Sequence, residues 1–202
     1  MKKINQPLIL ASSSKYRKEL LSRLKIPFIC ISPEINETAL DKETITETSM
    51  RLALMKAKKV SELNHNCIVI GSDQVAGDGT RHIGKPGNFS AAKKQLEFMS
   101  GKNIFFSNSI AVTNGITTRT ATTLVKCKFK NLDALTIKKY LEIEKPFDVA
   151  GSVKSEGLGI ILLEKIYSDD PTAILGLSII QLTNILKEFH IDPLLAEHDS
   201  NE

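Results

Sequence analysis

Hydrophobic residues recur along the chain at two spacings, which predict a succession of strands and helices. Short apolar runs, typical of strands covered on both faces, predict strands over residues 8–11, 28–31, 67–70 and 160–166. Apolar positions three and four residues apart predict helices over residues 14–25, 46–63, 90–99, 133–143 and 178–189. In the second of these helices, the core stripe is expected to contain Met50, Ala53, Leu54, Ala57 and Val60.

Turn signals divide these elements. Asn114-Gly115 interrupts a β-rich stretch over residues 103–130, and this dipeptide predicts a hairpin between two long antiparallel strands. The Gly77-Asp78-Gly79 turn predicts a smaller hairpin. Ser90 and Asp133 stand where side chains cap the first turn of a helix, so helices are expected to begin there.

Composition limits the class of protein. A chain of 202 residues with 42% hydrophobic content can form one domain, or two lobes around a cleft. The net charge of +4, without a block of Lys and Arg, suits a small anionic ligand better than a nucleic acid. No apolar run is long enough to span a membrane, and the run at 8–11 is too short for a secretory leader, so we expect a cytoplasmic protein. Cys30, Cys67 and Cys127 are widely spaced in apolar stretches, which favours buried free thiols over a disulfide or zinc site.

The first strand runs directly into three hydroxyls and a basic helix. Ser12, Ser13 and Ser14 precede the helix that carries Lys15 and Arg17. Free backbone N–H groups and the positive end of the helix dipole can bind an anion at such a junction. The alternative is an ordinary capped helix with a solvated basic face.

Two acidic residues are candidates for chemistry. Asp73 follows an apolar strand at the point where a loop is expected, which is where open α/β sheets form ligand crevices. It can hold a divalent metal or act as a general base, or it can simply form a turn. Glu37 lies in the polar loop before the second helix and is a second candidate carboxylate.

Two lysines could supply positive charge to the same cleft. Lys85 stands between Gly84 and Pro86, whereas Lys56 is followed by Lys58 and Lys59 on a predicted helix and could be a solvated surface charge. No Gly-rich phosphate loop or metal-binding His or Cys pair is present, so phosphate chemistry would need dispersed residues.

Taken in order, these segments resemble the Maf family of nucleoside triphosphate pyrophosphatases. The matching segments are residues 10–17 (LASSSKYR), 19–21 (ELL), 37–38 (ET), 56–57 (KA), 70–74 (IGSDQ), 84–86 (GKP) and 150–157 (AGSVKSEG). Each is weak alone, but their order and spacing from about Leu8 to Leu186 are specific.

The resemblance implies a fold and a reaction. The fold is a two-lobed α/β architecture, similar to HAM1 (ITPase-like) proteins, with a central mixed sheet, flanking helices and a cleft between lobes. It implies a single domain over residues 1–190 with a C-terminal tail over 191–202. The reaction is hydrolysis of a nucleoside triphosphate to the monophosphate and diphosphate with a divalent cation, Mg²⁺ or Mn²⁺. A homodimer is compatible with the resemblance, although no exposed apolar stripe demands one.

Roles for individual residues follow from the same resemblance. Asp73 matches the catalytic base and, with Glu37, a metal-associated carboxylate. The residues that match phosphate-facing positions are Ser12, Arg17, Lys56 and Lys85. This set suits attack of water on a phosphorus atom, which needs an oriented water and cations against the charge of the triphosphate.

Three positions assign a branch of the family. Members that act on dTTP and UTP carry Arg, Thr and Gln where this chain has Tyr16, Gln74 and Glu156. The 7-methyl-GTP branch carries an aromatic residue, usually Trp, with Gln and Glu, as here. Methylation makes guanine cationic, and an aromatic face attracts a cation by roughly 0.5 to 2 kcal/mol. Glu156 could accept two hydrogen bonds from guanine; otherwise Tyr16 is a packing aromatic and Glu156 a solvated loop charge.

The expected function is therefore hydrolysis of 7-methyl-GTP, which would prevent incorporation of modified nucleotides into nucleic acids. Alternatives are a dTTP or UTP pyrophosphatase of the same family, or a nucleotide-binding regulator of cell division and septum formation. The combination of Asp73, Glu37 and Lys85 favours catalysis, because a binding protein has little use for a base and a metal carboxylate at the phosphates.

Overall fold

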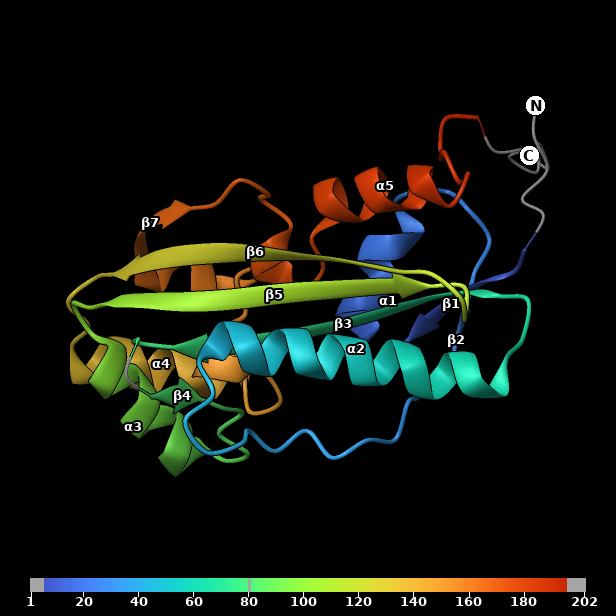
Figure 1. Cartoon of the computed structure of the whole chain (residues 1–202). Helices are drawn as coiled ribbons and strands as arrows, with labels where there is room; N and C mark the ends of the chain where they lie inside the picture. The colour runs from blue at the N-terminus through green and yellow to red at the C-terminus, as the bar shows by residue number, and fades with distance from the viewer. Residues whose placement is uncertain (1–5, 80, 196–202) are drawn as a thin grey trace.

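The computed structural model describes residues 6–79 and 81–195 and contains a seven-stranded sheet with helices on both faces (Figure 1). The strands are β1 (Leu8–Ala11), β2 (Ile29–Cys30), β3 (Ile68–Gly77), β4 (His82–Ile83), β5 (Asn103–Thr113), β6 (Thr118–Phe129) and β7 (Leu163–Tyr167). The helices are α1 (Lys15–Ser22), α2 (Ile45–Leu63), α3 (Phe89–Met99), α4 (Ala134–Glu144) and α5 (Ile179–Glu188). Short 3-10 helices are η1 (Ala150–Ser152), η2 (Leu158–Leu162) and η3 (Ala173–Leu175).

The sheet is mixed, with the order β2-β1-β3-β5-β6-β7 and β4 paired to β3. β1 is parallel to β2 and β3, whereas all other pairs are antiparallel. The expected α/β class and central mixed sheet are thus confirmed, as is the long β5–β6 hairpin around Asn114-Gly115.

Alternate residues of the central strands face different helices. Ile9 and Val69 pack toward α2, whereas Leu8, Leu10 and Ile70 pack with α1 and α5 on the opposite face (Figure 1). A separate hydrophobic cluster joins α3 and α4 to the far halves of β5 and β6. The core therefore consists of two main clusters, one at each end of the long strands.

The edge of β3 is open between these two ends. β1 pairs with β3 only as far as Ala11 opposite Gly71, and the pairing of β3 with β4 starts at Ala76 opposite Ile83. In the part of the chain that the structure describes, residues 72–75 of β3 consequently pair only with β5. This gap exposes a strand edge beside the N-terminus of α1.

Asp73 lies within a strand, which corrects the expectation that a loop begins there. β3 continues to Gly77 because β5 pairs with it along its full length, from Val69 opposite Thr113 to Gly77 opposite Phe105. It is β1, not β3, that ends beside Asp73. The small hairpin after the Gly77-Asp78-Gly79 turn is confirmed by the β3–β4 pairing.

Two helix predictions need correction. The cap of α3 is Asn88 rather than Ser90, because its side chain accepts a hydrogen bond from the backbone of Ala91. In α2, Leu54 is 38% exposed while Lys56 is 3% exposed, so the predicted core stripe is wrong at this point. The buried residues of α2 include Leu52, Ala53, Lys56, Ala57 and Val60.

Close packing at Gly71 explains the orientation of α2. A Cβ atom at this position would overlap the carbonyl oxygen of Ala53 and lie 2.6 Å from the backbone nitrogen of Ala57. The helix therefore lies against bare backbone, and its next inward-facing side chain, Lys56, is turned toward the open edge of β3. Met50 and Leu54 instead line a separate apolar hollow of about 960 Å³ on the outer side of α2.

The three cysteines are free, but only Cys127 is buried, and burial raises the pKa of its thiol to about 12. Cys30 is exposed and Cys67 is half-buried, which corrects the expectation of three buried thiols. Within the described ranges, no helix has both the length and the apolar character needed to cross a membrane. Most of the expected C-terminal tail, residues 196–202, lies outside the described residues.

Candidate active site

A cleft of about 510 Å³ lies at the open edge of β3. Its walls come from the β1–α1 junction, the irregular segment before α2, the middle of α2 and β3, and the loops around residues 85 and 148. Of the nine residues predicted for the site, eight line this cleft: Ser12, Tyr16, Arg17, Glu37, Lys56, Asp73, Gln74 and Lys85. The ninth, Glu156, lines a smaller pocket that shares several of these residues.

Lys56 joins the two predicted carboxylates. Its Nζ lies 2.6 Å from Asp73 Oδ1 and 2.6 Å from Glu37 Oε1. The lysine and Asp73 are both buried, whereas the Glu37 side chain is 48% exposed. Burial raises the pKa of Glu37, but the hydrogen bond from Lys56 and the charges of Lys56, Lys85 and Arg17 outweigh this and lower the pKa overall. The interpretation of Lys56 as a solvated surface charge is therefore wrong.

The first turn of α1 contributes both a cap and a cleft wall. Ser14 caps the helix by accepting a hydrogen bond from the backbone of Arg17 at 3.4 Å, and Ser12 Oγ accepts one from the backbone of Ser14 at 3.1 Å. Arg17 Nε donates to the carbonyl of Gly176 at 2.9 Å, and its Nη2 lies 4.0 Å from Asp73 Oδ1. The junction is thus both a capped helix and a wall of the cleft, and anion binding there stays a prediction.

The smaller pocket, of about 120 Å³, continues the cleft and contains the three predicted specificity residues. Gln74 Nε2 donates to the carbonyls of Ala173 and Ile174, at 3.0 and 3.2 Å. Tyr16 is half-buried beside the exposed side chain of Glu156. Burial raises the pKa of Tyr16, and the negative charges of Asp148, Glu156 and Glu144 raise it further. Three carboxylates therefore act on the Tyr16 ring, in a pocket that Arg17 and Lys85 also line.

Sequence reasoning missed two parts of the site. Asp148 lines both the cleft and the smaller pocket, and the loop from Ala173 to Gly176 supplies the carbonyls that orient Arg17 and Gln74. Backbone carbonyls leave no signature in a sequence. The only signal for Asp148 was its position in a polar loop rich in Gly and Ser.

The two ends of the cleft supply different chemistry. One end offers buried, paired charges on β3 and α2, with Lys85 exposed at the rim. The other offers an aromatic ring among carboxylates. Among the described residues, no group of three or more His, Cys, Asp or Glu side chains could bind a metal by itself.

Comparison with known sequences assigns the family. The family model described as "Maf-like protein" matches residues 7–189. The chain belongs to the Maf family. A Maf relative from Bordetella avium, named 7-methyl-GTP pyrophosphatase, is 49% identical over 190 residues, covering 94% of this chain and 96% of that protein. A relative from Ralstonia nicotianae with the same name is 45% identical over 192 residues, covering 94% and 98%.

Solved structures support the fold of this Maf protein. A HAM1 protein from Coxiella burnetii matches with a TM-score of 0.52 at 14% identity, covering 91% of this chain and 99% of that one. The Ham1 protein of Staphylococcus aureus matches with a TM-score of 0.53 at 13% identity, covering 91% and 100%. At these identities the likeness concerns the fold alone, and it confirms the HAM1-like architecture expected from the Maf resemblance.

Proposed function

We propose that this Maf protein hydrolyses 7-methyl-GTP to 7-methyl-GMP and diphosphate. The observation that carries the proposal is the continuity of the cleft, in which the paired charges of Lys56 and Asp73 lead into the acidic pocket around Tyr16. A nucleoside triphosphate is arranged in the same order, with its phosphates at one end and its base at the other. The names of the Bordetella and Ralstonia relatives support this substrate.

At the phosphate end, Asp73 is the proposed general base. Lys56 donates to Oδ1, which fixes the carboxylate and leaves Oδ2 to accept a proton from the attacking water. Arg17 and Lys85 would neutralise the charge that develops on the phosphate oxygens, and Ser12 would donate a hydrogen bond to them. Attack on the α-phosphorus releases diphosphate.

The carboxylates of Glu37 and Asp73 fit a divalent cation such as Mg²⁺ or Mn²⁺. Mg²⁺ is usually held by one or two carboxylates together with substrate phosphates, and these two carboxylates already converge on the Nζ of Lys56. When bound, the cation would offset the charge of the triphosphate and polarise the phosphorus centre. Lys56 would hold both carboxylates in place facing the substrate.

At the base end, charge selects the methylated guanine. The ring of 7-methylguanine carries a positive charge, which the carboxylates of Asp148, Glu156 and Glu144 around Tyr16 would stabilise. Tyr16 supplies an aromatic face, and Lys15 Nζ already lies 5.1 Å from its centroid, so the face is accessible to a cation. Glu156 would accept hydrogen bonds from the guanine edge.

The proposed substrate is a free nucleotide, so the proposal includes neither direct nucleic-acid binding nor a membrane partner. Action on the nucleotide pool agrees with a cytoplasmic location. A homodimer is part of the proposal on the strength of the Maf resemblance, and sedimentation of the purified protein would test it.

A substrate panel tests the proposed function. Purified protein with Mg²⁺ or Mn²⁺ is offered 7-methyl-GTP, GTP, dTTP, UTP and ATP, and products are separated to distinguish diphosphate from single phosphate. We expect 7-methyl-GMP and diphosphate as the main products. Preference for dTTP or UTP would reject the substrate, and release of single phosphate would reject the reaction.

A further inference from the structure

The segment that carries Glu37 has little structure of its own. Residues 31–44, between β2 and α2, form neither helix nor strand, and most side chains from Glu34 to Lys42 are exposed. Irregular segments of this length are uncommon in compact domains and usually serve a function. Glu37 contacts Lys56 from the middle of this segment. Because the segment lacks the hydrogen bonds of a helix or strand, contacts from elsewhere in the fold must fix the backbone next to Glu37.

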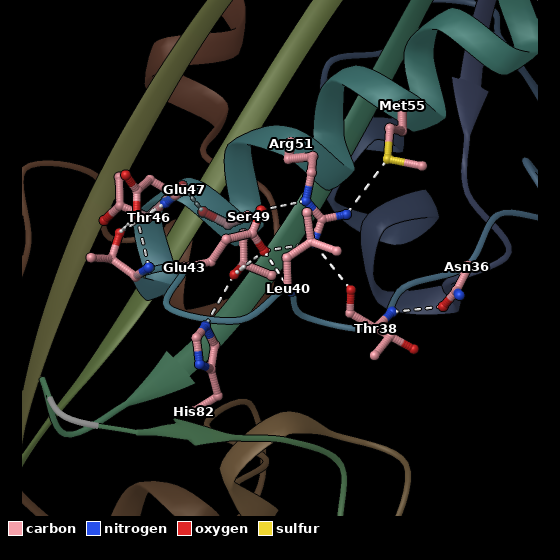
Figure 2. Close-up of polar contacts among 12 residues, drawn as sticks. Asn36, Thr38, Leu40, Glu43, Thr46, Glu47, Ser49, Arg51, Met55 and His82 are labelled. Atoms are coloured by element: carbon pink, nitrogen blue, oxygen red, sulfur yellow. Dashed lines mark hydrogen bonds and ion pairs between the residues drawn. The ribbon is translucent and has the colours of Figure 1, made fainter.

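The ion pair between Arg51 and Glu43, which lies outside the cleft, makes such contacts. Arg51 on α2 donates from Nε to Glu43 Oε1 at 2.5 Å and from Nη2 to Glu43 Oε2 at 2.7 Å (Figure 2). The two side chains are 22% and 14% exposed, although they lie in an otherwise exposed region. The hydrogen bonds from Arg51, with those from the backbone of Leu40 and from Thr48, outweigh burial and lower the pKa of Glu43 to about 2. Glu43 is therefore an anion at neutral pH.

The same ion pair connects the segment before α2 to α2 itself and, through Thr48, to β4. Arg51 Nη2 also donates to the carbonyl of Thr38, the residue directly after Glu37, at 3.1 Å. Glu43 Oε2 accepts from the backbone of Leu40 at 3.0 Å and from Thr48 Oγ1 at 2.9 Å. Thr48 Oγ1 in turn lies 3.0 Å from His82 Nε2 on β4.

We propose that Arg51 and Glu43 are positioning residues, which hold the backbone at Thr38 so that Glu37 is presented to Lys56 and to the metal and phosphates in the cleft. Neither residue lines the cleft, so neither touches substrate. The proposal rests on the function proposed above, because the consequence of misplacing Glu37 is weaker metal binding. Arg51 suits the task because its planar fork binds a carboxylate and a carbonyl together, which an ammonium group cannot do.

The chain contains a matched pair for comparison. Lys58 and Glu62 also lie on α2 and also form an ion pair, at 3.9 Å, but their side chains are 79% and 57% exposed. Their ion pair stays within α2, without a hydrogen bond or ion pair to the described residues of the segment with Glu37, and both line the outer hollow. Lys58→Met removes one positive charge from α2, as Arg51→Met does, and Glu62→Gln removes one negative charge, as Glu43→Gln does in the segment before α2. Neither control disturbs the hydrogen bond to Thr38.

The first experiment measures metal dependence and hydrogen exchange in Arg51→Met, Glu43→Gln, Lys58→Met and Glu62→Gln. The two test variants should need about tenfold more Mn²⁺ for half-maximal rate, since outer partners of metal ligands typically contribute ~10–100-fold. Their kcat at saturating Mn²⁺ should stay near that of the wild type. Without nucleotide or metal, amide exchange over residues 36–43 should be faster in the test variants alone. Arg51→Lys should have a Mn²⁺ requirement between those of the wild type and Arg51→Met, because lysine retains the positive charge but lacks the planar guanidinium.

A double-substitution cycle shows whether Arg51 acts through Glu37. In a Glu37→Gln background, Arg51→Met should change the Mn²⁺ requirement little, because the carboxylate it positions is already absent. Equal effects of Arg51→Met in both backgrounds would overturn the proposal. So would unchanged exchange over residues 36–43, which needs no catalytic activity.

Failure of the two proposals can be distinguished. A wild-type protein that hydrolyses no nucleotide rejects the proposed function, and hydrogen exchange together with Mn²⁺ binding by calorimetry then decides whether Arg51 and Glu43 order the Glu37 segment. An active wild type with unaltered Arg51→Met rejects the positioning role alone. Thermal unfolding of every variant separates a local effect from loss of the fold.

Discussion

The two ends of the cleft are built in different ways. Lys56 and Asp73 are 3% and 6% exposed and stand on α2 and β3, which Gly71 allows to pack backbone against helix. At the other end, Glu156 and Asp148 are exposed and belong to irregular segments. Regular elements fix side chains more precisely than loops do, and loops change more easily. The comparison suggests that the Lys56–Asp73 pair is fixed, whereas the carboxylates Asp148 and Glu156 of the other end are adjustable.

The largest effect on activity is expected from substitution of Asp73, at the end of the cleft built on α2 and β3. Asp73→Asn keeps the size of the side chain but removes the proposed general base, so kcat should fall by about 10²–10⁴-fold. The loss should be the same for every nucleotide, because this residue does not contact the base. Steady-state rates on 7-methyl-GTP and GTP measure it, with the exposed Asp169→Asn as the control. A change in substrate preference would mean that the two ends are not separate.

A smaller and more selective effect is expected at Glu156. Glu156→Gln removes a charge-assisted acceptor, whose contribution of about 1.5–3 kcal/mol corresponds to roughly ten- to a hundredfold in kcat/KM. The loss should appear mainly in KM and should be greater for 7-methyl-GTP than for GTP, because only the former base is cationic. If kcat falls instead, Glu156 belongs to the reaction centre and the contrast between the ends is wrong.

Substitution of Tyr16 should change the preference for 7-methyl-GTP over GTP less than substitution of Glu156 does. Tyr16→Leu removes the aromatic face, worth roughly 0.5 to 2 kcal/mol toward a cation, so the ratio of kcat/KM for 7-methyl-GTP over GTP should fall by a few fold or more. Tyr16→Trp offers a better face and should preserve or raise the ratio. An unchanged ratio in Tyr16→Leu would make this residue a packing aromatic only.

The smallest effect concerns stability at high pH. Burial and the nearby carboxylates raise the pKa of Tyr16 above the value of about 10 that is usual for tyrosine, so the folded protein keeps the proton to a higher pH than the unfolded chain does. The free energy of unfolding should thus decline as the pH rises above about 10, and less steeply in Tyr16→Phe. Urea unfolding of both proteins between pH 9 and 11 compares the slopes. Equal slopes would show that the pocket is less acidic than its geometry indicates.

The parts of the fold that depend on local chemistry could be predicted from the sequence. Asp133 caps α4 as expected, and Asn114-Gly115 joins β5 to β6, because each signal acts within a few residues. The cap at Asn88 was missed because Ser90, two residues later, carries an equally suitable side chain. Such errors shift a boundary without changing the architecture.

The centre of the site could not be derived in the same way. Lys56 resembles its neighbours Lys58 and Lys59 in sequence, and only contacts with distant Glu37 and Asp73 explain its burial. The open edge of β3 results from where β1 ends and β4 begins, which no local pattern encodes. Family resemblance selected these residues, whereas the structure explains why they meet.

The most direct test of the central claim, one nucleotide lying with its phosphates at Lys56 and Asp73 and its base at Tyr16 and Glu156, is the ratio of kcat/KM for 7-methyl-GTP over GTP. These substrates differ by one methyl group and the charge it confers. We predict a ratio of about ten or more, because the acidic pocket attracts the cationic base by ~1.4 kcal/mol or more. A ratio of one or below would contradict the proposed base pocket.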